Sequence, residues 1–134
     1  MLDPLPFEIT ALGWAALLAA LQLVALSVVA NLKVSQTYLA GPRDDPMQAP
    51  PVVGRLQRAQ TNMFEALTLF APAALYVALS GSSSGFTALC ATLFLLARIG
   101  YVPLYAFGVP LWRSVVWMVG FLATVLMLLA ALLL

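Results

Sequence analysis

The stretch ITALGWAALLAALQLVALSVVA occupies residues 9–30 and contains no charged side chain. An α-helix needs about 20 mostly apolar residues to cross the hydrocarbon core of a bilayer, so this stretch is long enough to span a membrane. It does not have the features of a cleaved signal peptide, because it is too long and is preceded by Asp3 and Glu8 rather than by basic residues. We therefore predict a membrane-spanning helix here.

Three further apolar stretches follow, and together they predict spans at about 9–31, 56–80, 86–107 and 111–134. The turns at residues 80–85 and 108–110 are short and rich in glycine, serine or proline, whereas the loop at residues 31–54 is longer. Pro103 is expected to kink the third span. The sequence thus predicts one all-α domain over residues 1–134, an integral membrane four-helix bundle.

Composition excludes several classes of function. Of 134 residues, 63% are apolar and 8% are charged, against roughly 25% charged residues in soluble domains. A net charge of +1 offers no large basic face for nucleic acid. The absence of histidine and the presence of one cysteine, Cys90, exclude a histidine metal site, a Ser-His-Asp triad and an internal disulfide. No metal site is expected.

Basic residues set the expected orientation, because cytoplasmic loops of membrane proteins are enriched in lysine and arginine. All six basic residues are predicted to lie toward the same side of the membrane: Lys33, Arg43, Arg55, Arg58, Arg98 and Arg113. We expect the long first loop to be cytoplasmic and both termini to lie outside.

Polar residues within the spans form stripes at helical spacing. Arg55, Arg58, Asn62 and Glu65 share one face of the second span, and Arg98, Tyr101 and Tyr105 share one face of the third. A structural interpretation pairs Arg58 with Glu65 and places Arg55 and Arg113 at lipid headgroups. A functional interpretation starts from the surplus of arginine over carboxylate, which an anionic ligand would neutralise.

The segment GRLQRAQTNMFEA, residues 54–66, resembles the RAxxNxxE signature of the MAPEG superfamily, the membrane-associated proteins in eicosanoid and glutathione metabolism. The segment ARIGYVPLYAFGVPLWRS, residues 97–114, is similar to a second block of that family. The resemblance is to bacterial-type members, and it implies a bacterial inner membrane protein that assembles as a homotrimer.

By this resemblance, glutathione is the co-substrate, bound between subunits near the cytoplasmic face. The residues implied to hold it are Lys33, Arg58, Gln60, Asn62, Glu65, Arg98, Tyr101 and Tyr105. Arg113 matches an arginine proposed to stabilise the thiolate, with Ser114 as the next candidate. A nearby cation lowers the pKa of a thiol, whose thiolate is the nucleophile.

The implied function is that of a glutathione transferase or peroxidase acting on lipophilic substrates. Thr61, Pro103 and Trp117 depart from positions common in the family. Of these, Thr61 and Trp117 favour the alternative of a non-catalytic membrane scaffold that binds lipid or another membrane protein. A small multidrug transporter is a third class, disfavoured because such proteins need an acidic residue within the first span, where this chain has only Glu8 at the edge.

Overall fold

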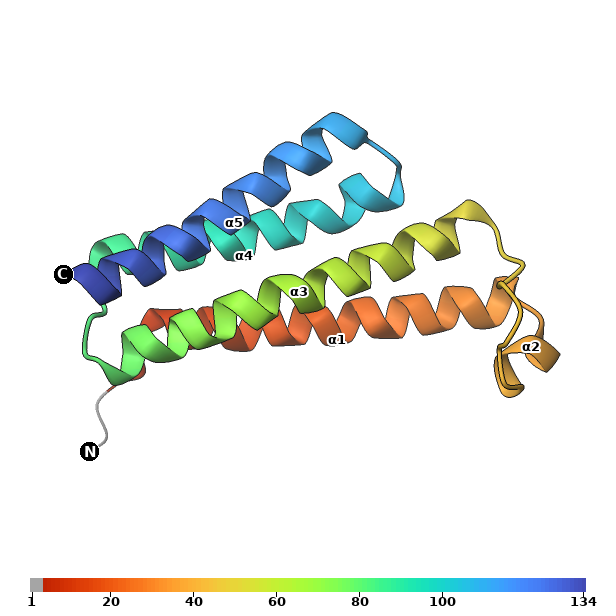
Figure 1. Cartoon of the computed structure of the whole chain (residues 1–134), viewed down its shortest axis with the longest axis horizontal. Helices are drawn as coiled ribbons and strands as arrows, with labels where there is room; N and C mark the ends of the chain where they lie inside the picture. The colour runs from red at the N-terminus through yellow and green to blue at the C-terminus, as the bar shows by residue number, and fades with distance from the viewer. Residues whose placement is uncertain (1–3) are drawn as a thin grey trace.

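The helices follow the apolar stretches of the sequence. The computed structural model describes residues 4–134, and all regular structure in that range is helical (Figure 1). The elements are α1 (Phe7–Lys33), α2 (Gln36–Ala40), α3 (Pro51–Leu79), α4 (Gly85–Ala106) and α5 (Pro110–Leu133). Within the described range, all of these except α2 are long and apolar enough to cross a membrane. The predicted all-α fold with four membrane-spanning helices is confirmed.

The largest departure from the predicted boundaries is at the start of the second span. α3 begins at Pro51 rather than near residue 56, and its polar first turns are helical. Pro51 occupies the first helical position, where a missing backbone N–H costs nothing. The short helix α2 in the first loop was not predicted. Arg43 ends this turn with a positive φ of 59°, and its guanidinium donates to the Leu39 carbonyl at 2.8 Å.

The two short turns are built by glycine and by a helix cap. Gly81 and Gly108 have φ of 68° and 71°, a left-handed conformation that glycine adopts without steric cost. Ser84 and Thr87 form a capping box at the start of α4. α4 continues through Pro103 to Ala106, and the Pro103 carbonyl accepts from the Phe107 N–H at 3.0 Å.

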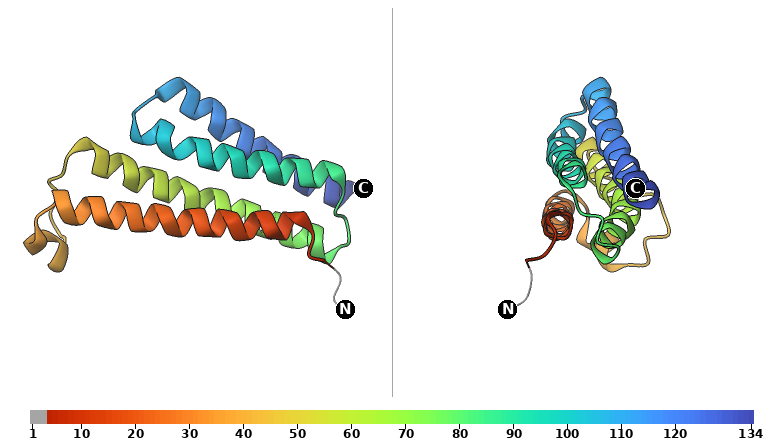
Figure 2. Two further views of the ribbon diagram at one scale, coloured as in Figure 1. Left: turned by 180° about the vertical axis from the view of Figure 1, so that it is seen from behind. Right: turned by 90° about the vertical axis from the view of Figure 1, so that its left-hand side faces the viewer.

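The bundle consists of two helix pairs, α1 with α3 and α4 with α5. Both ends of the chain lie at one end of the bundle, and α2 lies at the opposite end (Figure 1). The two pairs are closest at the end with the termini and diverge toward the other end, as Figure 1 and the left view of Figure 2 show. At the diverging end, the α4–α5 turn is therefore joined to α3 by a long side chain, that of Arg55, rather than by close backbone packing.

Small residues allow the helices to approach each other at the end with the termini, which is the closed end of the bundle. Ala11, Ala15 and Ala19 lie four residues apart on one face of α1 and are buried. Close backbone approach at such stripes favours association in lipid, where van der Waals packing replaces the hydrophobic effect. Phe70 of α3 stacks on Phe94 of α4 at a centroid distance of 3.9 Å, and both rings are buried.

A buried carboxylate joins α1 to α4 at the same end. Glu8 is fully buried and accepts hydrogen bonds from the Ser83 hydroxyl at 2.9 Å and from the Thr87 hydroxyl. In the sequence, Glu8 stands only at the edge of the first predicted span. Its partners lie more than 70 residues away in the sequence, so no local pattern revealed this contact.

Candidate functional site

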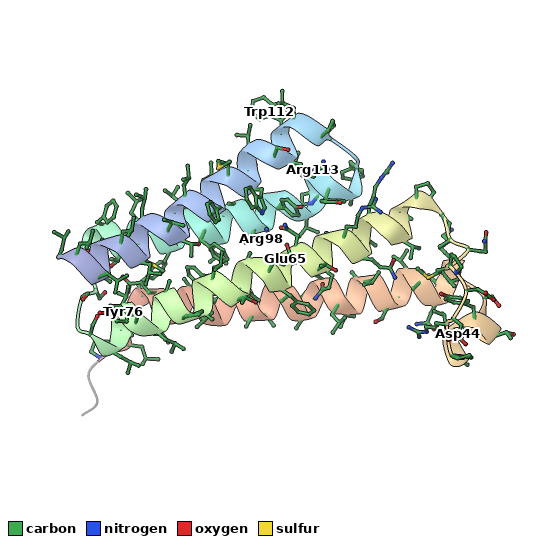
Figure 3. All side chains as sticks on the ribbon, viewed as in Figure 1. Asp44, Glu65, Tyr76, Arg98, Trp112 and Arg113 are labelled. Atoms are coloured by element: carbon green, nitrogen blue, oxygen red, sulfur yellow. The ribbon has the colours of Figure 1, made fainter. Side chains whose placement is uncertain are left out.

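Polar side chains gather where α3, α4 and α5 face one another. Figure 3 shows Glu65 of α3, Arg98 of α4 and Arg113 of α5 pointing into the space between the two helix pairs. This space lies on the side of the bundle where the pairs diverge. The arrangement of the hairpins therefore brings the two predicted polar stripes together.

Arg98 is the deepest of these charges, with only 2% of its surface exposed. Its Nη1 donates to the Asn62 Oδ1 at 2.7 Å, and its Nε contacts the Met63 sulfur at 3.3 Å. Its guanidinium lies 4.3 Å from the centroid of the Tyr101 ring. Its Nη2 is buried and has no hydrogen-bond partner in the described chain. Arg98 is thus a buried full charge held only by neutral groups.

Tyr105 contacts two further arginines, one through its hydroxyl and one through its ring. The Nε of Arg58 donates to the Tyr105 hydroxyl at 2.9 Å, and the Arg113 guanidinium lies 4.7 Å from the Tyr105 ring centroid. The rings of Tyr101 and Tyr105 are 5.5 Å apart, so they connect the surroundings of Arg98 to those of Arg58 and Arg113. Cation–π contacts of this kind contribute about 0.5–2 kcal/mol each, but they leave the positive charges unneutralised.

Arg55 lies at the end of the cluster nearest the α4–α5 turn. Its Nη1 donates to the Ala106 carbonyl, at the end of α4, at 3.4 Å. The Arg55 guanidinium carbon lies 3.2 Å from the position that a Cβ would take at Gly108, so this side chain packs against the α4–α5 turn. Arg55 therefore fastens the start of α3 to the α4–α5 turn.

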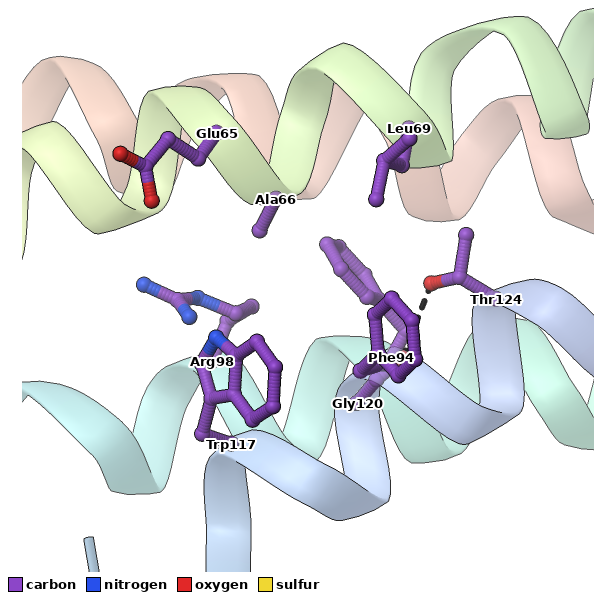
Figure 4. Close-up of a pocket in the computed structure, with 9 residues that line it drawn as sticks. Glu65, Ala66, Leu69, Phe94, Arg98, Trp117, Gly120 and Thr124 are labelled. Atoms are coloured by element: carbon purple, nitrogen blue, oxygen red, sulfur yellow. Dashed lines mark hydrogen bonds between the residues drawn. The ribbon is translucent and has the colours of Figure 1, made fainter. Parts of the chain in front are cut away.

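Two cavities adjoin the cluster. The polar cavity has a volume of about 340 Å³ and is lined by Asn62, Tyr101, Arg113, Ser114, Trp117 and Met118. The apolar cavity has a volume of about 180 Å³, and its lining includes Glu65, Leu69, Phe94, Arg98, Trp117 and Phe121 (Figure 4). Trp117 belongs to both linings, so its indole is a wall shared by the two cavities.

Several residues from the resemblance lie elsewhere. Gln60 is buried against α1, and its amide donates to the Ala19 carbonyl at 3.4 Å. Lys33 is the last residue of α1 and is exposed. Glu65 is exposed in the single chain and lines the apolar cavity. The pairing of Arg58 with Glu65 is not formed in the described chain, because Arg58 turns to Tyr105 instead.

The charge balance of the cluster indicates what it can bind. In residues 4–134, the partners of Arg58, Arg98 and Arg113 are an amide, a sulfur, a hydroxyl and tyrosine rings, without a carboxylate ion pair. Arginine binds carboxylates through two parallel hydrogen bonds. The site is therefore suited to an anionic ligand with hydrogen-bonding groups. The described residues contain no group of three metal-ligating carboxylates or thiols.

Some contacts of the site could not be predicted from the sequence. Met63 lies within the motif at residues 54–66 but is apolar, so its residue type did not mark it as a site residue, yet its sulfur faces Arg98. Three residues that line the apolar cavity, Phe94, Leu69 and Phe121, come from three different helices. Their convergence depends on how α4 and α5 cross α3, which no helical periodicity encodes.

Comparison with known proteins gives one family. The sequence model of the MAPEG family matches residues 11–133, which is nearly the whole chain. A search of curated proteins finds no sequence that matches this chain.

Proposed function

The chain belongs to the MAPEG family, and from this premise we propose that it binds glutathione and presents the thiolate to lipophilic electrophiles. Family membership supports a membrane protein related to eicosanoid and glutathione metabolism. The observation that carries the finer proposal is the cluster of three arginines on Tyr101 and Tyr105, whose charges no carboxylate of the described chain neutralises.

Glutathione matches this cluster in charge. It is a tripeptide with two carboxylates and one amino group, so it can neutralise two guanidinium groups and offer a cation in return. Arg58 and Arg98 would take the carboxylates, since both have nitrogens free of anionic partners. Asn62 and Tyr105 supply neutral hydrogen-bonding groups, and Glu65 can accept from the amino group. Gln60 and Lys33 are left out of this proposal because they face other regions.

Arg113 is placed for a different task. It lines the polar cavity together with Ser114 and stands in the first turn of α5. A guanidinium beside the glutathione sulfur favours the thiolate over the thiol and lowers the pKa of that thiol. In transfer, the thiolate sulfur forms a bond to the electrophilic carbon, and the leaving group departs with the electron pair of the broken bond. The thiol proton has already passed to water.

The exposure of Arg58 and Glu65 on α3 supports a homotrimer. Glu65 is the middle residue of α3, and it is exposed in the single chain, as is Arg58. An ionised side chain facing lipid within a span is costly. Association of subunits through the α3 face would remove Glu65 from lipid and would enclose a ligand on the arginine cluster. We propose that the site is completed by a neighbouring subunit in this way.

The proposed orientation keeps the site on the cytoplasmic side. Lys33 ends α1, Arg43 follows α2 and Arg55 lies in the first turns of α3, so all three belong to the end of the bundle that holds α2. The positive-inside rule places that end in the cytoplasm, where a bacterial inner membrane protein would meet cytoplasmic thiols.

Calorimetric titration of the detergent-purified protein with glutathione tests the proposal. S-methylglutathione serves as a matched ligand, because it keeps the carboxylates but cannot form a thiolate. Arg58→Leu should weaken the binding of both ligands. Arg113→Leu should weaken the binding of glutathione and leave that of S-methylglutathione unchanged. Arg43→Leu removes the same charge from the first loop and should leave both titrations unchanged.

The same titration decides between an enzyme and a scaffold. Absence of heat at millimolar glutathione would refute the proposal and favour a non-catalytic scaffold that binds lipid or a membrane partner. Equal loss of both ligands in Arg113→Leu would refute the role of Arg113 at the sulfur.

A further inference from the structure

We propose that an anionic phospholipid binds where α1 meets the first loop, with an acyl chain along α1 and its phosphate on Arg43. Two adjoining hollows form the site, a groove on α1 and a cavity at the end of that groove, which we call the α1 groove and the loop cavity. The inference goes beyond the proposed glutathione function and does not depend on it, because neither hollow is lined by a residue of the arginine cluster.

The α1 groove runs along an exposed apolar face of that helix. It has a volume of about 480 Å³ and is lined by Leu23, Val24, Ser27, Val28, Asn31 and Leu32. Its four aliphatic side chains are between 48% and 76% exposed, so in a membrane they face lipid. From residue 23 to residue 32 a helix rises about 14 Å, which is close to half of a hydrocarbon core of about 30 Å. The groove therefore matches the depth of one leaflet, on the side of the membrane that holds α2 (Figure 1).

The loop cavity continues the α1 groove toward α2. Its volume is about 380 Å³, within the range of roughly 300–1,000 Å³ that ligand pockets have. Leu23, Ser27 and Asn31 line both hollows and lie four residues apart on one face of α1. The other walls of the loop cavity include Arg43 from the first loop and Gln57 from α3. An apolar surface thus passes directly into a polar cavity.

Arg43 gives the loop cavity a positive charge. Among the described residues, it is the only lysine, arginine or carboxylate on the lining. Its Nε and Nη2 donate to the Leu39 carbonyl at 3.1 and 2.8 Å, which fixes the guanidinium and leaves Nη1 for a ligand. Asp44 and Asp45 follow in the sequence but do not line the cavity, and the Asp45 backbone carbonyl accepts from the Tyr38 hydroxyl at 2.8 Å. The cavity is therefore suited to an anion.

A phospholipid combines the two properties that the hollows require. Its acyl chain would fill the α1 groove, and its phosphate would meet the Arg43 guanidinium, whose planar array of N–H groups binds phosphate. Tyr38 also lines the loop cavity, and tyrosine is enriched where membrane meets water. Basic pockets at this depth bind anionic lipid headgroups, whereas a soluble phosphate would leave the groove empty.

The bound lipid would connect three parts of the chain. The loop cavity is bounded by the end of α1, by the first loop and by Gln57 near the start of α3. At this end of the bundle the two helix pairs diverge, so the helices have few neighbours to hold them (Figure 1). A lipid between α1, the first loop and α3 would therefore brace the diverging end.

Native mass spectrometry of the detergent-purified protein tests the site. Phosphatidylglycerol and phosphatidylcholine with the same acyl chains are the probes, because they share the apolar part and differ in net charge. We expect the first phosphatidylglycerol on each chain to bind about tenfold more tightly than phosphatidylcholine. Arg43→Asn removes the cation and keeps a residue that tolerates the positive φ of 59°. It should reduce this preference to less than about twofold.

Two control variants separate the site from general attraction to lipid. Lys33→Gln removes a cation from the end of α1 but outside the loop cavity, and it should leave most of the preference intact. Ser27→Phe places a ring where the two hollows meet and should weaken phosphatidylglycerol binding about tenfold. Ala16→Phe places the same ring on the same exposed face of α1, about 10 Å before Leu23, and should change nothing.

Several outcomes would overturn the proposal. Equal binding of the two lipids by the unchanged protein, or equal effects of Arg43→Asn and Lys33→Gln, would reduce the site to general attraction. Displacement of phosphatidylglycerol by an equal concentration of glycerol 3-phosphate would assign the loop cavity to a soluble phosphate ester. Loss of subunits from the assembly in Arg43→Asn would assign it to a second copy of the chain.

The lipid site and the glutathione site fail separately. Selective lipid binding by a protein that gives no heat with glutathione would support this site and refute the glutathione function alone. Because the loop cavity shares no residue with the arginine cluster, Arg43→Leu should still leave glutathione binding unchanged. Glutathione binding without a preference between the two lipids would refute only the lipid site.

Discussion

Glu8→Ala is expected to destabilise the bundle more than the loss of any exposed charge. Glu8 is fully buried at the start of α1 and accepts hydrogen bonds from the hydroxyls of Ser83 and Thr87, which precede and open α4. The substitution removes both bonds and leaves a cavity at the junction. It thereby loosens the end at which the two helix pairs are packed most closely.

The magnitude follows from the surroundings of the two donors. A hydrogen bond to a charged group contributes about 1.5–3 kcal/mol. Ser83 is exposed and can bond to water instead, so its loss is partly recovered. Thr87 is buried, and its hydroxyl can turn instead to Ser84, whose carbonyl lies at 3.1 Å and whose hydroxyl lies at 3.4 Å. We therefore expect Glu8→Ala to lower the free energy of unfolding by about 2–4 kcal/mol. Glu8→Gln retains one acceptor oxygen and should lower it by roughly half of that.

Equilibrium unfolding in mixed detergent micelles measures these differences in free energy of unfolding. Asp44→Ala is the matched control, because it also removes one carboxylate but from the exposed first loop. Hydrogen exchange of the first turns of α1 and α4 gives a local readout. If Glu8→Ala and Asp44→Ala have equal stability, or if exchange increases equally along all helices, the reasoning is refuted.

Three further results are expected. A cysteine introduced at Ser83 should react with an impermeant thiol reagent from outside intact cells, and one at Gln48 should not; Cys90 is buried and supplies no background, and the reverse labelling pattern would contradict the orientation. Arg113→Leu should reduce the ultraviolet thiolate absorbance of bound glutathione and slow turnover more than it weakens binding, and an unchanged absorbance would remove that role. Phe70→Ala should cost about 3–5 kcal/mol of unfolding free energy, because it deletes a buried ring stacked on Phe94, and a cost below about 1 kcal/mol would contradict the observed packing.

The spans could be predicted from the sequence because the signal is local. A membrane helix satisfies its backbone hydrogen bonds within one segment, so the length of an apolar stretch locates each span without knowledge of its neighbours. The polar start of α3 was underestimated for the same reason. Residues 51–55 include Pro51 and Gly54, which are typical of loops, and end in the charged Arg55, although Pro51 is well placed to begin a helix.

The candidate site could be predicted only as two separate faces. The spacing of Arg58 and Asn62 placed them on one face of α3, and that of Arg98, Tyr101 and Tyr105 placed them on one face of α4. Which arginine meets which partner depends on the rotation and crossing of the helices. Arg58 donates to Tyr105 across 47 residues of sequence, and Gln60, only two positions away, points to α1 instead.

The difference between the two ends of the bundle explains why cations gather at one of them. At the end with the termini, the short Ser80–Gly85 turn, the Glu8 hydrogen bonds and the alanine stripe of α1 hold the helices close. Such packing leaves no room for long charged side chains. Toward α2 the helix pairs diverge, and arginine side chains fill the widening space by lying across tyrosine rings. A buried charge without a counter-ion is costly, so an anionic ligand would stabilise the open end, as Glu8 and its hydroxyl partners stabilise the closed one.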